Sequence, residues 1–244
     1  MKPFLLLATR AQDVAADGEH AAVLRFGGLA PERVRRVRLE QAPMPRIDLD
    51  DYAGIVVGGG PFNSSDPETS KSPTQRRVER EFAALLDEVV DRDFPFLGAC
   101  YGVGTLGAHE GAIIDRTYGE RIGPVEVTLT PEGVADPLLA GMPPRFHALV
   151  GHKEAVRALP AHAVLLASSA HCPVQMFRIR SNLYATQFHP ELDVAGLLER
   201  IEVYRDHGYF EPSEHAEVLA RATSREITAP HRILRAFVER YGTP

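Results

Sequence analysis

The stretch FPFLGACYGVGTLGA, residues 94–108, decides which fold this sequence predicts. An apolar run of strand length ends at Gly98, and Cys100 follows it among small residues and further glycines. A strand, a sharp turn with the thiol at its tip and a helix that starts at once form a nucleophile elbow. We expect the first N–H groups of that helix to point at Cys100 and to lower the pKa of its thiol. The alternative is a buried structural cysteine in a glycine-rich connection.

Glycine suits the two positions that flank this turn, Gly98 and Gly102. A Cβ atom at either position is expected to collide with the neighbouring strand or with a substrate. The turn itself is expected to hold the nucleophile in a strained backbone conformation.

A second motif lies downstream in YATQFHPELD, residues 184–193. Its alternating pattern predicts the end of a strand, and Pro190 biases His189 toward extended backbone. Residues two apart in an extended segment point the same way, so His189 and Glu191 project together. A thiol, an imidazole base and a carboxylate that orients the base are the groups that activate a cysteine nucleophile. The sequence therefore predicts that Cys100, His189 and Glu191 meet in one site.

A third motif is DYAGIVVGGG, residues 51–60, in which a core strand runs into three glycines. A phosphate-binding loop is not favoured, because the segment has neither GK[ST] nor GxGxxG. We expect instead a backbone N–H exposed for an anion, since acyl transfer through Cys100 develops charge on a carbonyl oxygen. Losing one such donor typically costs about 3–4 kcal/mol. The alternative is a turn that needs positive φ.

The segments VVGGGP, GACYG and QFHPE resemble, in this order and at fitting intervals, the signature segments of class I glutamine amidotransferases. The likeness is greatest to the glutaminase domain of GMP synthases. It implies an α/β fold of flavodoxin-like architecture, with a mostly parallel central sheet flanked by helices. It also implies that Cys100 is the nucleophile, His189 the general base and acid, and Glu191 the orienting carboxylate.

The same resemblance implies where an oxyanion is held. Its two donors are the backbone N–H groups of Gly60 and Tyr101, with Gly59 as the alternative to Gly60 and a substrate-binding candidate.

Two further positions concern the substrate. The segment ALVGHKEAVRALP, residues 148–160, resembles a family segment in which a histidine precedes an acidic residue near the substrate's α-amino group. Glu154 takes that place here, with His152 structural beside it, although aspartate is commoner in the family. The alternative is a surface Lys–Glu pair on a turn. At Gly104 the family usually has a glutamine that helps to hold the substrate, in the pattern C-x-G-x-Q.

These residues imply a free-standing glutaminase-type hydrolase that cleaves the γ-amide of glutamine through a γ-glutamyl thioester. No metal or cofactor is expected, and ammonia transfer is expected to need a separate synthetase partner. Gly104 keeps a γ-glutamyl peptidase or related amide hydrolase open as an alternative. A non-catalytic regulatory subunit with the same fold is the third possibility.

Composition limits the remaining choices. A net charge of −6 gives no electrostatic footprint for nucleic acid. No stretch approaches the ~20 apolar residues of a membrane span, and the apolar run near the N-terminus is too short for a signal peptide. With only two cysteines we expect no disulfide framework and a cytoplasmic protein. Cys172 could be a second catalytic thiol or bind zinc with His171, but the absence of CxxC or two-His spacing favours simple packing.

The coarse organisation follows from periodicity. We expect a glutamine amidotransferase domain over residues 1–192 and a helical C-terminal extension packed on it over residues 193–244. The first helix of that extension is expected to end at Gly208. The other expected elements are buried strands at Pro3–Ala8 and 51–60, an edge strand at Val34–Leu39, and helices at Glu19–Leu29 and from Pro73 to about Val90, the last capped by Ser72.

Overall fold

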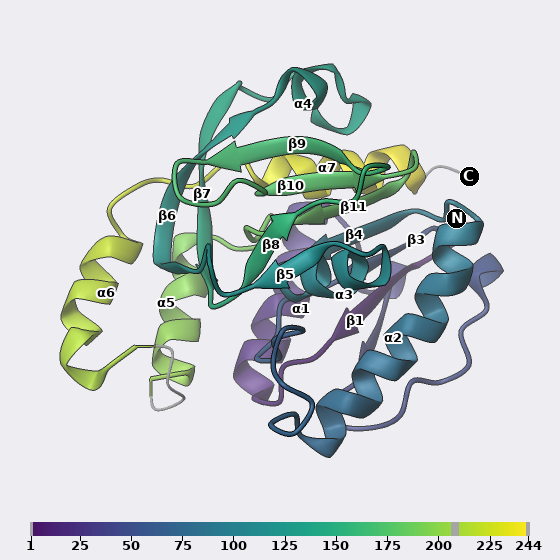
Figure 1. Cartoon of the computed structure of the whole chain (residues 1–244), viewed down its shortest axis with the longest axis horizontal. Coiled ribbons are helices and arrows are strands. Elements are labelled where there is room, and N and C mark those ends of the chain that lie inside the picture. Colours follow the sequence, from purple (N-terminus) through teal and green to yellow (C-terminus); the bar gives the residue numbers. More distant parts are fainter. Residues whose placement is uncertain (1, 206–209, 243–244) are drawn as a thin grey trace.

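A nine-stranded sheet, in the order β2-β1-β3-β4-β11-β10-β9-β6-β7, runs through the part of the chain that the structure describes (Figure 1). The structure is a computed structural model, and it describes residues 2–205 and 210–242. The expected helix end at Gly208 therefore lies outside the described residues. The strands are β1 (Phe4–Ala8), β2 (Val34–Arg38), β3 (Gly54–Val57), β4 (Phe96–Ala99), β5 (Ile113–Asp115), β6 (Glu120–Leu129), β7 (Arg145–His152), β8 (Ala155–Ala158), β9 (Val164–Ser169), β10 (Met176–Ile179) and β11 (Leu183–Thr186).

Helices cover the sheet, and β5 and β8 form a separate antiparallel pair. The α-helices are α1 (Asp13–Gly27), α2 (Pro73–Asp91), α3 (Tyr101–His109), α4 (Pro131–Ala135), α5 (Val194–Val203), α6 (His215–Ala222) and α7 (His231–Tyr241).

The expected parallel core is confirmed, because β2, β1, β3, β4 and β11 lie side by side in this order and pair parallel with one another. Helices α1 and α2 make the crossovers between β1 and β2 and between β3 and β4. The sheet continues beyond β11 through antiparallel pairs. Short connections join β9 to β10 and β10 to β11, and a short connection can join only antiparallel neighbours. The sheet is therefore mixed, with its parallel part around the predicted elbow.

Both faces of the parallel strands are buried, which explains their continuous apolar runs. On one face Phe4, Leu6 and Leu97 share a hydrophobic core with α1 and α7. On the other face Leu5, Leu7 and Phe96 share a second core with α2 and α3. Because successive side chains of a strand point to opposite faces, one short run supplies both cores. The core shared with α7 packs the C-terminal part of the chain against β1.

The predicted strands and helices are found, with the strand expected at 51–60 reduced to Gly54–Val57 and the largest change at the start of the first helix. Ser72 caps α2 as expected, with its hydroxyl accepting from the N–H of Gln75 at 3.0 Å. The expected helix Glu19–Leu29 instead begins at Asp13 and ends at Gly27. The small and acidic residues of its first turns also suit a loop, but Ala15 and Ala16 are buried there, and an aspartate suits the positive end of a helix.

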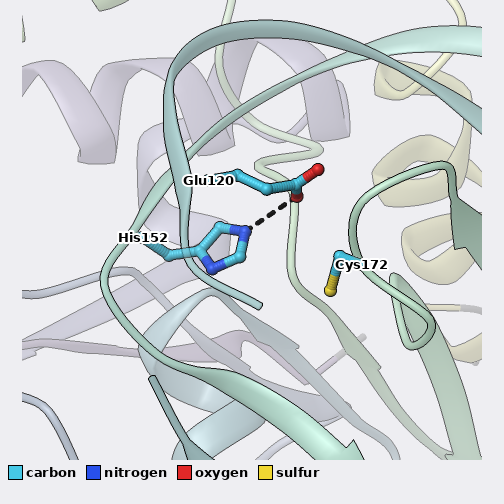
Figure 2. Close-up of side chains that lie close together, drawn as sticks. All are labelled: Glu120, His152 and Cys172. Atoms are coloured by element: carbon cyan, nitrogen blue, oxygen red, sulfur yellow. Dashed lines mark hydrogen bonds and ion pairs between the residues drawn. The ribbon is translucent and has the colours of Figure 1, made fainter. Parts of the chain in front are cut away.

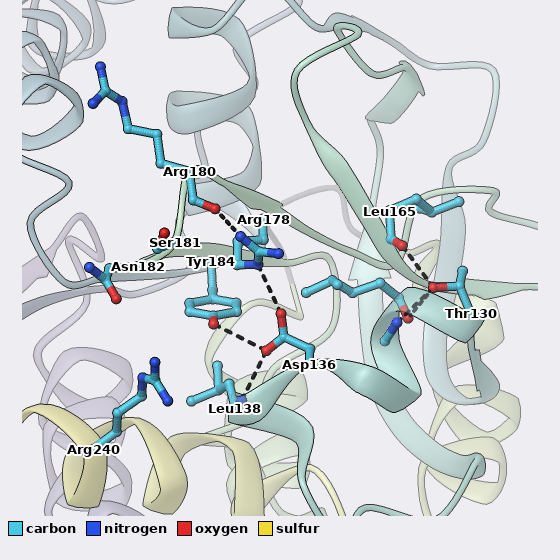
Figure 3. A network of polar contacts seen from close by, with 12 residues as sticks. Thr130, Asp136, Leu138, Leu165, Arg178, Arg180, Ser181, Asn182, Tyr184 and Arg240 are labelled. Atoms are coloured by element: carbon cyan, nitrogen blue, oxygen red, sulfur yellow. Dashed lines mark hydrogen bonds and ion pairs between the residues drawn. The ribbon is translucent and has the colours of Figure 1, made fainter.

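An aspartate in the connection after α4 ties the antiparallel strands to that segment (Figure 3). The Asp136 carboxylate accepts from the hydroxyl of Tyr184 on β11 at 3.1 Å and from Arg178 Nε on β10 at 2.9 Å. It also accepts from the N–H of Leu138 at 2.9 Å. Asp136 is buried, and these donors offset the cost of removing its charge from water.

The elbow is present where β4 meets α3. Cys100 lies between them with φ 52° and ψ −91°, a conformation that non-glycine residues seldom adopt. An added Cβ on Gly98 would lie 2.9 Å from the backbone Cα, C and O atoms of Gly102. The strand and the first turn of the helix can therefore approach this closely only with glycine at position 98. The expected collision at Gly102 is wrong, because a Cβ there would lie at ordinary distances of 3.5–3.6 Å from Val57.

This contact predicts that Gly98→Ala destabilises the fold. Backbone atoms of Gly102 have to move, so we expect a loss of about 1–3 kcal/mol in the free energy of unfolding, measured by urea denaturation. Gly107→Ala, within α3, is the matched control, because its Cβ would meet other atoms at ordinary distances of 3.4–3.5 Å. We expect the control to be neutral or slightly stabilising. Equal stability of the two variants would contradict this account of the elbow.

Candidate active site

The predicted site residues lie at the carboxyl ends of the parallel strands, where ligands bind in open α/β sheets. Cys100 follows β4, Gly60 follows β3 and His189 follows β11. A cavity of about 180 Å³ is lined by Cys100, Tyr101, Gly60 and Glu154 among others. A second cavity of about 60 Å³ also reaches Cys100 and Gly60, and His189 lines it. The Cys100 side chain therefore borders open space on two sides.

Backbone hydrogen bonds fix the position of Cys100. Its N–H donates to the carbonyl of Thr186 on β11 at 2.8 Å, and its carbonyl accepts from the N–H of Val103 at 2.9 Å. The strained φ is thus over-determined by contacts on both sides of the turn. Tyr101 is the first residue of α3, so its N–H has no acceptor within the helix.

His189 and Glu191 project together, as their spacing predicts. The Nδ1–H of His189 donates to Glu191 Oε1 at 2.8 Å, and both side chains are less than a tenth exposed. The imidazole nitrogen that remains, Nε2, is the one free to exchange a proton. Burial disfavours the imidazolium, but the Glu191 charge and a hydrogen bond with Cys100 outweigh it and raise the pKa of His189 to about 9. Sulfur, imidazole and carboxylate are therefore brought into one site.

Sequence reasoning missed a buried row of charges behind the carboxylate. Arg200 on α5 donates to Glu191 Oε1 at 3.2 Å and lies 3.7 Å from Glu19 Oε1 on α1. Glu19 in turn pairs with Arg10 at 2.9 Å, and all four side chains are less than a tenth exposed. Burial opposes ionisation of Glu191, but His189 and Arg200 hold its pKa well below the ordinary value.

A weak signal for two of these residues was present in the sequence. Glu19 lies on the same helix face as the buried Ala15, Ala16 and Val23. Arg200 falls on the buried face of α5, next to Ile201. A charge within an apolar stripe indicates a buried partner, but the sequence does not say which one.

The glycines after β3 are required by close packing. An added Cβ on Gly59 would lie 2.6 Å from His189 Cε1 and 3.5 Å from the Cβ of Cys100. One on Gly60 would lie 2.0 Å from Thr9 Oγ1. The alternative of a turn that needs positive φ is wrong, because neither glycine has positive φ. Gly60 lines both cavities, whereas Gly59 is packed against the imidazole.

Glu154 is buried beside the larger cavity, so the alternative of a surface Lys–Glu pair is wrong for the glutamate. Its two carboxylate oxygens accept from the N–H groups of Ser64 and Ser65, each at 2.7 Å. The same loop fills the space at Gly104, where an added Cβ would lie 2.4 Å from Ser64 Oγ and 3.1 Å from Glu154 Oε1. A serine loop thus occupies the room that a larger residue at position 104 would need.

Cys172 is placed away from this site. It is fully buried and lines neither of the two cavities, and burial raises the pKa of its thiol to about 12. A second catalytic thiol is therefore not supported. Its neighbour His171 is exposed. Cys172 instead lies near Glu120 and His152, which together are the residues best suited to hold a metal ion.

Comparison with known proteins agrees with this geometry. The Glutamine amidotransferase class-I family model matches residues 30–196. A GMP synthase (glutamine-hydrolysing) from Thermomicrobium roseum is 32% identical over 140 residues, which are 57% of this chain and 23% of that protein. A subunit of the glutamine-hydrolysing GMP synthase of Thermoplasma volcanium is 32% identical over 147 residues, covering 59% of this chain and 65% of that protein. The chain thus spans less than two thirds of the length of these relatives.

Solved structures share the fold over nearly the whole chain. A glutamine amidotransferase from Thermotoga maritima superposes with a TM-score of 0.79 at 21% identity, covering 100% of both chains. One from Methylobacillus flagellatus gives a TM-score of 0.74 at 17% identity, covering 99% of this chain and 94% of that one. Together with the family match over residues 30–196, these findings establish that the chain belongs to the class I glutamine amidotransferases.

Proposed function

We propose that the protein hydrolyses the γ-amide of glutamine, with Cys100 as nucleophile. The observation that carries this proposal is the arrangement at the elbow. A cysteine held at positive φ borders a cavity and shares a hydrogen bond with an imidazole that a buried carboxylate orients. A regulatory subunit without catalysis has no need of this set.

In the first step the Cys100 sulfur attacks the γ-carbonyl carbon and His189 takes the thiol proton. The C–N bond then breaks as His189 returns that proton to the departing nitrogen, and ammonia leaves a γ-glutamyl thioester. In the second step His189 removes a proton from water, which attacks the thioester. The C–S bond breaks, the sulfur recovers its proton, and glutamate is released.

The negative charge on the carbonyl oxygen needs donors in both steps. The N–H of Tyr101 suits this role because it begins α3 without an acceptor inside the helix. The N–H of Gly60 is the second proposed donor, since Gly60 borders both cavities that reach Cys100. Glu154, anchored by the Ser64–Ser65 loop, is the proposed partner for the substrate's α-ammonium group.

A second substrate class, γ-glutamyl conjugates, is favoured by one observation. Ser64 and Glu154 crowd the space beside Gly104, and residues 60–63 of the same loop, which precede Ser64, line the cavity at Cys100. That loop replaces the side chain expected to hold glutamine. The same thiol chemistry would then release an amine other than ammonia.

Ammonia released by hydrolysis of glutamine would need a protein that uses it. The relatives include both a GMP synthase and a protein that is one subunit of such a synthase. We propose that a separate synthetase protein receives the ammonia.

Among residues 2–205 and 210–242, no helix has the length and apolar character that a bilayer crossing requires.

Cys100→Ala is expected to lower glutamine hydrolysis by roughly 10⁴-fold or more, because no other group replaces the nucleophile. Ammonia and glutamate release would be measured with glutamine and, in parallel, with γ-glutamyl dipeptides. A γ-glutamyl electrophile should add its mass to the peptide that carries Cys100 and leave the Cys172 peptide unmodified. Turnover of dipeptides alone would favour the second substrate class, and no turnover or adduct with either would favour a regulatory subunit.

The buried carboxylate predicts how activity depends on pH. Protonated His189 is required to release the amine, and its pKa is raised to about 9, so kcat/KM should fall as the pH rises through about 9. Glu191→Gln removes the charge that raises this pKa and should move the alkaline limb down by roughly 1–3 pH units. The maximal rate should also fall, by up to about 10⁴-fold as in serine triads. If kcat/KM of the variant fell at the same alkaline pH as in the unmodified protein, His189 would not be the group whose titration causes that fall.

A further inference from the structure

A second cluster of chemically reactive side chains contains none of the proposed catalytic groups, although one member, His152, lines the same cavity as Cys100. Glu120 begins β6, His152 ends β7, and Cys172 lies in the connection between β9 and β10 (Figure 2). One ligand atom from each of the three lies within 4.8 Å of the other two. The side chains of His152 and Glu120 are 2% and 5% exposed, and Cys172 is 0% exposed.

The hydrogen bonds of His152 leave a place for a cation. Its Nδ1 lies 2.8 Å from the carbonyl oxygen of Glu154, which can only accept, so Nδ1 carries a hydrogen. Its Nε2 faces a second acceptor, Glu120 Oε2, at 2.9 Å. A neutral imidazole and an ionised carboxylate cannot bond each other here, because neither offers a hydrogen, whereas a metal ion between Nε2 and the carboxylate would bind both. A backbone carbonyl that holds the other ring nitrogen is the usual support of a metal-binding histidine.

The carboxylate and the thiol also have protein partners, and the Cys172 thiol donates to the carbonyl of Val174 at 3.4 Å, a bond that is given up when the thiol loses its proton. Glu120 accepts from Ser169 Oγ at 3.1 Å and from Gln175 Nε2 at 2.6 Å. Ser169 also accepts from the N–H of Cys172 at 3.0 Å, which fixes the turn that carries the thiol. Gln175 is 0% exposed, and its Oε1 has no hydrogen-bond partner among the described residues. A buried oxygen without a donor, on a side chain bonded to Glu120, is suited to a cation.

We propose that Glu120, His152 and Cys172 bind a zinc ion in a site that does not involve Cys100, with the fourth coordination position left open. Imidazole, thiolate and carboxylate are the ligands that Zn²⁺ takes in proteins, and ligand atoms around tetrahedral zinc lie roughly 3.3–3.8 Å apart. Side-chain shifts of about 1 Å bring the three atoms to that spacing. On binding, the thiol proton leaves to solvent. The ion with one carboxylate and one thiolate is then neutral, which suits a buried place.

The site has a consequence for the neighbouring cavity. Zinc would tie the β9–β10 connection to β6 and β7 at the point where Glu120 and His152 already face each other in the sheet. His152 precedes Glu154 by two residues, so the ion would also fix the wall on which Glu154 lies. The inference does not depend on the proposed hydrolysis, because its test reads metal binding alone.

The chain has only two cysteines, so replacing Cys100 leaves Cys172 as the one thiol that can bind a metal ion. Cys100→Ala protein, freed of metal with a chelator, would be titrated with Co²⁺ under reducing conditions. We expect a near-ultraviolet thiolate-to-cobalt band that saturates at one ion per chain and disappears when Zn²⁺ is added. In this variant the band can arise only from Cys172. Elemental analysis after incubation with zinc should likewise give about one ion per chain, and the melting temperature should rise.

Matched variants in the same background identify the ligands. Cys172→Ser should abolish the band, and Glu120→Gln should weaken cobalt binding by more than about tenfold. His171→Ala, which changes the exposed neighbour, should leave the titration unaltered. The folded Cys100→Ala protein decides the question even if a ligand variant does not fold. Absence of both the band and bound zinc in that protein, or a band that persists in Cys172→Ser, overturns the proposal.

Discussion

The close approach of β4 to the first turn of α3 is the constraint on which the site depends. It is possible because Gly98 has no Cβ to meet the backbone of Gly102. The chain must then reverse within one residue, and Cys100 takes a positive φ to do so. Hydrogen bonds to β11 and within α3 hold that residue against its own conformational preference. The sulfur thus lies beside the strand end that supplies the imidazole.

Burying an imidazole and a carboxylate side by side is costly unless their charges are balanced. Here the Glu191 carboxylate pairs with Arg200, and Glu19 with Arg10, so two positive and two negative side chains lie together. A proton that moves from the Cys100 sulfur to His189 leaves the net charge of the site unchanged. In the proposed mechanism this transfer creates an imidazolium, and the Glu191 carboxylate that would stabilise it is already held in place by Arg200.

The departure at Gly104 and the cluster around Glu120 concern the same wall of the cavity. A glycine on α3 admits the Ser64–Ser65 loop, which binds the Glu154 carboxylate. Two residues earlier, His152 lies between the Glu154 carbonyl and Glu120. Glu154, which lines the cavity, is thus supported from the loop after β3 and from the antiparallel strands. The parallel core alone does not position it.

Local patterns were sufficient for much of this protein. Residues close together in the chain determine four features: the elbow, the cap of α2, the buried parallel strands and the pairing of His189 with Glu191. Steric and hydrogen-bonding rules apply to them directly. The start of α1 was misplaced because small and acidic residues suit both a loop and a helix, and packing chose between them. Only the tertiary structure places Arg200 beside Glu191, Ser64 beside Gly104 and Cys172 near Glu120. These contacts depend on how strands and helices pack against one another, and a local sequence pattern does not encode that packing.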